Sequence, residues 1–303
     1  MFKQFALSLV LSFLPFEFSQ AITSIDTDLV NKNVVFFFEA DATGHVQTSK
    51  LVATGFLIMV PAKNGDHQYP LLVTARHVVD PVWAECASTN PTKLFARVNT
   101  LRFDPETDQT GVEYIPVELT NNGNATWVKS DNESVDVAVL QAPKELLSGK
   151  YNVRFVNFRN FGSTEEIAKL GIGSQVASTG LVPGVEGRKR NHPIFKFGKI
   201  ANIPDEMPTI PCEGNSQLRP FHIWWIAISL VPGNSGSPIY FDPLFPPGAD
   251  LSAGEPRAMI IGLQSLAVTG ADLAGMTPTA DIIDVIRRAV PKDAEFRIGL
   301  PPK

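Results

Sequence analysis

The chain has 303 residues, of which 44% are hydrophobic and 19% are charged, and its formal net charge is -5. This composition provides ample material for a hydrophobic core, which excludes a chain that is disordered throughout. The acidic balance argues against a nucleic-acid-binding protein, and the one compact basic run, at 188–190, lies among glycines and a proline, as expected of a solvated loop rather than a phosphate-binding patch.

Residues 1–21 have the features of a secretory signal peptide. Lys3 precedes a short apolar run, and Ser19 and Ala21 are small residues at the two positions that a signal peptidase reads. The run is too short for a stable bilayer-spanning helix, and no later stretch is long and apolar enough. We therefore expect a soluble protein, secreted or periplasmic, without a stable membrane anchor. An uncleaved segment is the alternative, because Glu17 and Phe18 suit the cleavage site poorly.

Short runs rich in Val, Ile and Phe predict β-strands along most of the chain. The 24 prolines and 22 glycines separate these runs, which lie at 34–38, 55–60, 71–74, 94–98, 112–117, 135–140, 175–180, 194–203, 222–228, 237–240 and 259–266. Many short strands with frequent turns favour an all-β barrel or sandwich.

Two segments predict helices. Ser163 and Glu166 form a capping-box pattern that opens a short helix, which Gly171 would end. Residues 279–290 place Ile and Val side chains toward one side and two arginines in the last turn, where cations suit the helix dipole. The second of these helices lies close to the C-terminus.

The domain organisation follows from the strand pattern. A segment at 142–160 separates two strand-rich halves. We expect a signal peptide at 1–21, a first strand-rich half at 22–145, an interdomain connection at 146–160, and a second strand-rich half with the C-terminal helix and tail at 161–303.

The segment Pro232-Gly233-Asn234-Ser235-Gly236-Ser237-Pro238 is the most specific chemical motif of the chain. A serine between glycines can expose its hydroxyl, because the flanking backbone is free to form a tight turn. Ser235 would be a nucleophile, and the backbone N–H groups of Gly233 and Ser235 would form an oxyanion hole. A Gly/Ser loop without catalytic function is the alternative.

A serine nucleophile needs a base and an orienting carboxylate. His77 directly follows the predicted buried strand at 71–74, so it would be held firmly at the strand end. Asp136 lies in an otherwise apolar predicted strand, where a carboxylate is costly unless it is hydrogen-bonded, and the N–H of a histidine would satisfy it. A structural histidine and a strand-edge aspartate facing water are the alternatives.

The order of these residues narrows the class of hydrolase. Every histidine precedes Ser235, which excludes the order Ser, acid, His of the α/β-hydrolases around this serine. The Gly-x-Ser-x-Gly motif also fails, because residue 237 is serine. The order His77, Asp136, Ser235 is that of the chymotrypsin class.

With these motifs, the sequence resembles chymotrypsin-like (trypsin-fold) serine peptidases, especially their exported bacterial branch. The resemblance rests on three ordered motifs, Thr74-Ala75-Arg76-His77, Asp136-Val137-Ala138-Val139-Leu140 and Gly233-Asn234-Ser235-Gly236-Ser237-Pro238, and on weaker similarity of the strands at 54–58, 173–180 and 260–265. It implies an all-β fold of two six-stranded antiparallel β-barrels with a short C-terminal helix. It also implies a catalytic triad of His77, Asp136 and Ser235 that hydrolyses peptide bonds through an acyl-enzyme.

The resemblance also implies a substrate pocket at Ser229, Gln264 and Ser265. A small neutral residue at Ser229 offers no partner for a basic side chain, so we expect an uncharged P1 residue. Asn234 replaces the aspartate that pairs with a freed N-terminus in animal digestive relatives, so we expect no activation of that kind.

Two further expectations concern cysteines and cofactors. Cys86 and Cys212 could form one disulfide in an oxidising compartment or remain free thiols. No Cys/His cluster has metal-ligand spacing, and the proposed chemistry needs no cofactor. The expected partner is a protein or peptide substrate, without nucleic acid. A catalytically silent trypsin-fold binding module and a structural exported β-protein are the competing interpretations.

Overall fold

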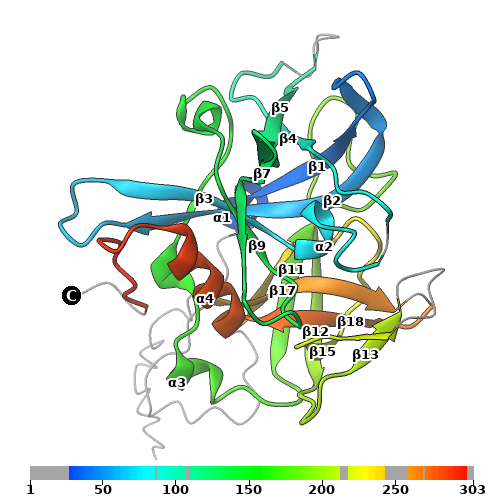
Figure 1. The fold of residues 1–303 in the computed structure, drawn as a ribbon, viewed down its shortest axis with the longest axis vertical. Helices are drawn as coiled ribbons and strands as arrows, with labels where there is room; N and C mark the ends of the chain where they lie inside the picture. The colour runs from blue at the N-terminus through cyan, green and yellow to red at the C-terminus, as the bar shows by residue number, and fades with distance from the viewer. Residues whose placement is uncertain are drawn as a thin grey trace, which may run out of the picture.

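The computed structural model describes residues 27–85, 87–104, 106, 110–211, 218–242, 258–268 and 270–298. The signal segment at 1–21, both cysteines and most of the loop at 241–257 lie outside this part of the chain, so their predictions stay predictions. The chain forms two β-rich halves, one above the other in Figure 1.

The first half is an eight-stranded sheet in the order β5-β4-β1-β2-β3-β9-β8, with β10 paired in parallel to β2. Its strands are β1 (Val34–Ala40), β2 (Val46–Pro61), β3 (Gln68–Thr74), β4 (Lys93–Asn99), β5 (Val112–Glu118), β8 (Trp127–Lys129), β9 (Ala138–Gln141) and β10 (Val156–Asn157). A separate two-stranded sheet joins β6 (Thr120–Asn121) and β7 (Asn124–Ala125). The sheet therefore has two more strands than the six-stranded barrel expected for this half.

The second half is a closed six-stranded barrel in the order β11-β12-β15-β18-β17-β16. Its strands are β11 (Gln175–Gly180), β12 (Ile194–Asn202), β15 (Trp224–Ala227), β16 (Pro238–Phe241), β17 (Met259–Val268) and β18 (Leu273–Pro278). A two-stranded sheet of β13 (Thr209–Pro211) and β14 (Leu218–Pro220) lies outside the barrel.

Short helices complete the fold. They are α1 (Thr27–Asn33), α2 (Arg76–Val79), α3 (Thr164–Ile167), α4 (Thr279–Ala289) and two 3-10 turns, η1 (Lys144–Leu147) and η2 (Phe158–Asn160). Helix α3 has the predicted capping box, in which the Ser163 hydroxyl accepts from the N–H of Glu166 and the Glu166 carboxylate accepts from the N–H of Ser163. The predicted all-β fold with a short C-terminal helix is confirmed.

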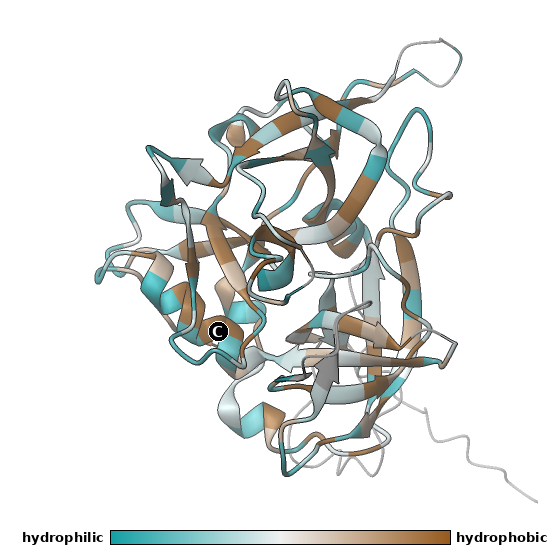
Figure 2. Cartoon of the chain, turned by 45° about the vertical axis from the view of Figure 1, so that its right-hand side comes forward, coloured by the Kyte–Doolittle hydropathy of each residue, from teal (hydrophilic) through white to brown (hydrophobic). Residues whose placement is uncertain are grey.

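Helix α4 packs against strands of both halves. It buries Ile282, Ile283, Val285 and Ile286 and packs against β8 and β9 of the first half and β17 and β18 of the second. Its apolar face is continuous with the main hydrophobic core, which extends from the phenylalanines of β1 to strands of the barrel. A second, smaller core fills the barrel interior. Figure 2 shows the hydrophobic segments along the strands of both halves.

One local prediction is wrong, and one strand of the barrel lies outside the predicted set. Asp136 does not lie within a strand, because β9 begins at Ala138 and residues 135–137 form an irregular segment before it. The run at 273–278 was not predicted as a strand, because its glycine and proline are typical of turns. It is nevertheless β18, which pairs with β15 and β17 and so closes the barrel. A Cβ at Gly275 would lie 2.8 Å from side chains of Ile223 and Leu266, so the close packing explains a glycine in this strand.

Among the residues that the structure describes, no helix has the length and hydropathy required to cross a bilayer.

Candidate active site

His77 lies on α2, directly after the buried end of β3. The residues Leu71 to Thr74 are fully buried, and Ala75 is the N-cap of the helix. Val78 and Val79 are also buried, whereas 23% of the His77 side chain is exposed. The apolar neighbours therefore fix the backbone of His77 while its ring reaches the surface.

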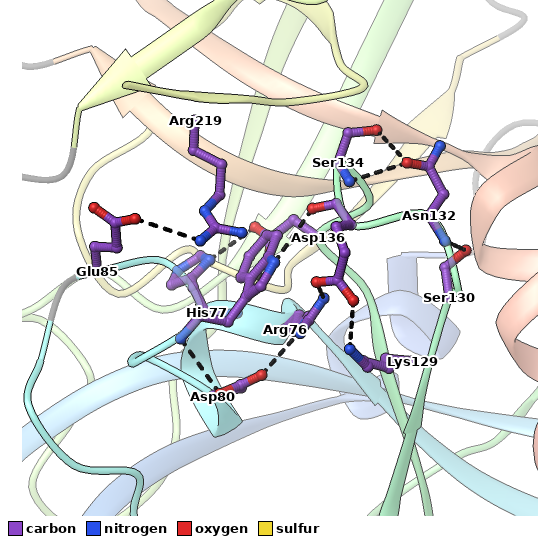
Figure 3. Close-up of polar contacts among 12 residues, drawn as sticks. Arg76, His77, Asp80, Glu85, Lys129, Ser130, Asn132, Ser134, Asp136 and Arg219 are labelled. Atoms are coloured by element: carbon purple, nitrogen blue, oxygen red, sulfur yellow. Dashed lines mark hydrogen bonds and ion pairs between the residues drawn. The ribbon is translucent and has the colours of Figure 1, made fainter. Parts of the chain in front are cut away.

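Asp136 is completely buried and turns both carboxylate oxygens toward His77. Its Oδ1 accepts from the backbone N–H of His77 at 2.9 Å, and its Oδ2 lies 2.8 Å from His77 Nδ1 (Figure 3). A buried carboxylate is costly unless it is hydrogen-bonded, so this contact assigns the proton to Nδ1 of the neutral ring. His77 Nε2 is then free to act as a base.

Two opposing effects act on the pKa of His77. Burial lowers it, while the charge of Asp136 and the hydrogen bond to that carboxylate raise it, and the net result is a pKa above the ordinary value of 6.5. The pair therefore stabilises the imidazolium that forms when His77 takes a proton.

The Ser235 segment is a tight double turn. The N–H of Asn234 donates to the carbonyl of Val231 at 3.0 Å, and that of Ser237 donates to the carbonyl of Asn234 at 2.8 Å. Gly233 and Gly236 have φ values of +96° and +83°, in the left-handed region that favours glycine. The sequence Gly-Asn-Ser-Gly thus meets the backbone requirement of this turn.

The two N–H groups predicted to form an oxyanion hole are available. Within the described part of the chain, the backbone N–H groups of Gly233 and Ser235 donate to no protein acceptor, whereas those of Asn234, Gly236 and Ser237 all do. Unused donors on alternate residues of one turn can bind an oxygen that carries negative charge.

The buried side chain of Asn234 holds this turn in place. Its Oδ1 accepts from the N–H of Val231 at 3.0 Å, and its Nδ2 donates to the carbonyl of Leu181. Both polar atoms of a side chain that is 2% exposed are therefore satisfied by backbone groups.

Thr54, which the sequence motifs did not single out, joins the Ser235 turn to the first half. Its N–H donates to the carbonyl of Ser235 and its hydroxyl to that of Gly233, both at 2.9 Å. The same hydroxyl accepts from the N–H of Leu181 at 3.2 Å, and the Thr54 carbonyl accepts from the Thr74 hydroxyl at 2.8 Å. A threonine beside Gly55 in an apolar run was the available sign of this role.

The turn approaches the backbone that leads into α2. A Cβ built on Gly236 would lie 2.2 Å from Thr54 O, 2.4 Å from Thr74 Oγ1 and 3.0 Å from Ala75 N. Gly236, the neighbour of Ser235, therefore lies against Ala75, and Ala75 is two positions before His77. Among the described residues no hydrogen bond joins the Ser235 hydroxyl to His77. Hydrogen bonds of this kind are commonly long in unliganded sites and shorten when substrate binds.

The three residues predicted to form the substrate pocket differ in accessibility. Ser229 is exposed, and its carbonyl accepts from Lys196 Nζ at 2.6 Å. Gln264 and Ser265 are only 1% and 4% exposed. The backbone of Gln264 is paired with the Ser235 turn, since its carbonyl accepts from the N–H of Gly236 and its N–H donates to the carbonyl of Ser237. Their role in a pocket stays a prediction.

A pocket of about 400 Å³ opens beside the segment that leads to Asp136. Both halves line it. The first half contributes Glu85, Asn132, Glu133 and Ser134, and the region of the β13–β14 sheet contributes Met207, Arg219 and Pro220. Arg76, which is buried and directly precedes His77, donates to the carboxylate of Glu133, one of the residues that line this pocket, at 2.7 Å. Sequence reasoning gave Arg76 and Glu133 no role of their own, because isolated charged residues are usually solvated.

No group of three His, Cys, Asp or Glu side chains within the described ranges has an arrangement that could hold a metal ion.

No protein-family model matches this chain, and no curated protein matches it. Solved structures that it resembles include the active form of the Rv3671c protease from M. tuberculosis, with a TM-score of 0.47 and 16% identity over 95% of this chain and 94% of that chain. The protease domain of MamO from Magnetospirillum magneticum has a TM-score of 0.46 and 13% identity over 84% of this chain and 96% of that chain.

Proposed function

We propose that the protein is a serine endopeptidase with His77 as general base, Asp136 as the orienting carboxylate and Ser235 as nucleophile. The observation that carries this proposal is the buried Asp136 carboxylate, whose two oxygens hold the ring and the backbone of one histidine at 2.8 and 2.9 Å. The turn of Ser235 supports the proposal as well, because it has two unused N–H groups and approaches the backbone of Ala75, which leads into the helix of that histidine. A solvated histidine or a strand-edge aspartate would need neither feature.

The reaction is acyl transfer in two halves. His77 Nε2 takes the hydroxyl proton of Ser235 as Oγ bonds to the peptide carbonyl carbon, and the N–H groups of Gly233 and Ser235 bind the resulting oxyanion. The C–N bond then breaks, and His77 gives its proton to the leaving amine. Water attacks the ester by the same route, which releases the acid and restores Ser235.

Asp136 supports this sequence at each proton transfer. It keeps the proton on Nδ1, so that the lone pair of Nε2 is available at the start of the reaction. It also stabilises the charged ring in the intermediate, in keeping with the raised pKa of His77. Loss of the carboxylate would remove both effects.

The substrate is proposed to be a peptide with an uncharged P1 residue. Ser229 carries no charge, and the ammonium of Lys196 on its carbonyl would repel a basic side chain. Burial lowers the pKa of Lys196, which limits but does not remove this repulsion. A digest of a peptide library would test the proposal, and cleavage mainly after Lys or Arg would contradict it.

The protein is further proposed to act outside the cytoplasm, as a secreted or periplasmic member of the exported bacterial branch of trypsin-fold peptidases. The signal-like segment at 1–21 supports this proposal. Fractionation of cells that express the full chain, with N-terminal sequencing of the product, tests it. A product that keeps residues 1–21 in the cytoplasm would contradict it.

A fluorophosphonate probe tests the catalytic proposal directly. We expect labelling of the folded protein and none of Ser235→Ala. Ser237→Ala is the matched control, because Ser237 lies in the same turn but is fully buried, so its loss should leave labelling intact. A folded wild-type protein that is not labelled would favour the catalytically silent binding module instead.

A further inference from the structure

Trp83 lies between two guanidinium groups that come from different halves of the molecule. Arg76 Cζ is 4.4 Å and Arg219 Cζ is 5.2 Å from the indole ring centroid. Trp83 is 6% exposed, and its indole N–H donates to the carbonyl of Glu133 at 3.2 Å. Cation–π contacts are strongest where water is excluded, so burial favours this arrangement.

Each guanidinium is also held by carboxylates. Arg76, with a side chain only 4% exposed, donates to Asp80 at 3.1 Å and to Glu133 at 2.7 Å, while Arg219 lies 3.5 Å from Glu85 (Figure 3). Hydrogen bonds from Lys129 and Arg76 lower the pKa of Glu133 to about 2. Glu133 therefore stays ionised at any pH at which His77 titrates.

These contacts involve residues close in sequence to His77 and to Asp136. Arg76 directly precedes His77, and Glu133, bound by both Arg76 and Trp83, lies three residues before Asp136. Arg219 belongs to β14 of the second half. The cluster of Arg76, Trp83 and Arg219 thus ties the helix of the base, the segment of the acid and the second half to one another.

We infer that Arg76, Trp83 and Arg219 are positioning residues that hold Asp136 at hydrogen-bonding distance from His77, an inference that rests on the proposed function. Asp136 lies in an irregular segment, so ladder hydrogen bonds of a strand do not fix its backbone. Displacement of such a group by a fraction of an ångström weakens its hydrogen bond and slows the step that depends on it. The cluster supplies the rigidity that the missing strand would otherwise give.

Arg219→Gln is the most informative variant, because it removes the guanidinium that the second half contributes to the cluster and leaves the contacts within the first half in place. The Arg219 side chain is 27% exposed, so the substitution should be tolerated. Trp83→Phe is the second variant, since it keeps a ring but loses the hydrogen bond to Glu133. Arg287→Gln is the matched control: its guanidinium also stacks on an aromatic ring, that of Phe296 at 5.5 Å.

The measurements are the NMR resonance of the His77 Nδ1 proton, the pKa of His77, and kcat and KM on a peptide substrate. His77→Gln identifies the resonance, which must be separated from that of His222, paired with Asp281 nearby. We expect Arg219→Gln and Trp83→Phe to shift the resonance and to reduce kcat about 10-fold with little change in KM. Trp83→Phe, which leaves every charge in place, should also lower the pKa of His77. Arg287→Gln should change none of these.

The inference is overturned if both cluster variants fold and show the same His77 Nδ1 proton resonance, the same pKa of His77 and the same kcat as the wild-type protein. The proton and pKa measurements need no activity. If the unchanged protein proves inactive, the proposed function fails, and the two spectroscopic readouts still decide whether the cluster positions Asp136.

Discussion

Replacing Gly236 with alanine tests whether contact with the first half sets the position of the Ser235 turn. Gly236 has a φ of +83°, and a Cβ added to it would lie 2.2 Å from Thr54 O, a backbone atom that already accepts a hydrogen bond from Thr74. No real Cβ can lie so close to a carbonyl oxygen. The turn must therefore move away from Thr54 and from the helix that carries His77.

The expected magnitude has two parts. A non-glycine residue in the left-handed region costs about 1–2 kcal/mol. Overpacking against neighbours that cannot easily move adds about 1–3 kcal/mol. Gly173 provides the control, because its φ is +93° but nothing lies within 4 Å of its Cβ position, so Gly173→Ala should show the first cost alone.

Urea unfolding measures the stability of both variants, and the rate of fluorophosphonate labelling measures the geometry of the turn. We expect Gly236→Ala to lose about 2–5 kcal/mol and most of its labelling rate, against about 1–2 kcal/mol and unchanged labelling for Gly173→Ala. Equal stability losses in the two variants would refute the argument that the turn is packed tightly against Thr54.

The remaining predictions concern buried or titrating groups. Asn234→Asp should lower the free energy of unfolding in urea by about 3–5 kcal/mol near neutral pH, because it places an unpaired buried carboxylate against a backbone carbonyl. Part of this loss should be recovered in acid, where the carboxylate is protonated, and a loss independent of pH would count against this reasoning. The hydrogen bond from His222 to Asp281 raises the pKa of His222, so that pair should stabilise the fold fully below about pH 6.5 and lose its effect as pH rises through the higher folded value. Asp281→Asn should therefore cost stability in acid but not at about pH 9, and a cost that grows with pH would contradict the sign. Peptidase activity should fall in acid as His77 is protonated, with a midpoint above pH 6.5, and a rate independent of pH from about 5 to 8 would exclude His77 as the base. Asp136→Asn should reduce kcat by about 10⁴-fold.

Features that depend on local pattern could be predicted from the sequence. The strand at 175–180 has the predicted bounds, and the helix at 279–289 differs by one residue, because alternation and helical periodicity are written in consecutive residues. The capping box at Ser163 could be predicted for the same reason, since it needs only two residues three positions apart. Strand 273–278 was missed because its glycine and proline obscure a role that only the barrel closure reveals.

The candidate catalytic side chains and their order along the chain could be predicted from the residues alone. The contacts that hold these side chains form between segments that come together in the folded chain. Asp136 in sequence is a charge in an apolar run, and its contacts with His77 appear only once the two segments fold together. The same is true of Thr54, which bonds Gly233, and of Trp83, which contacts Arg219, because these partners lie far away along the chain. The physical reason is that burial and hydrogen-bond pairing are properties of residues in space, which local periodicity does not encode.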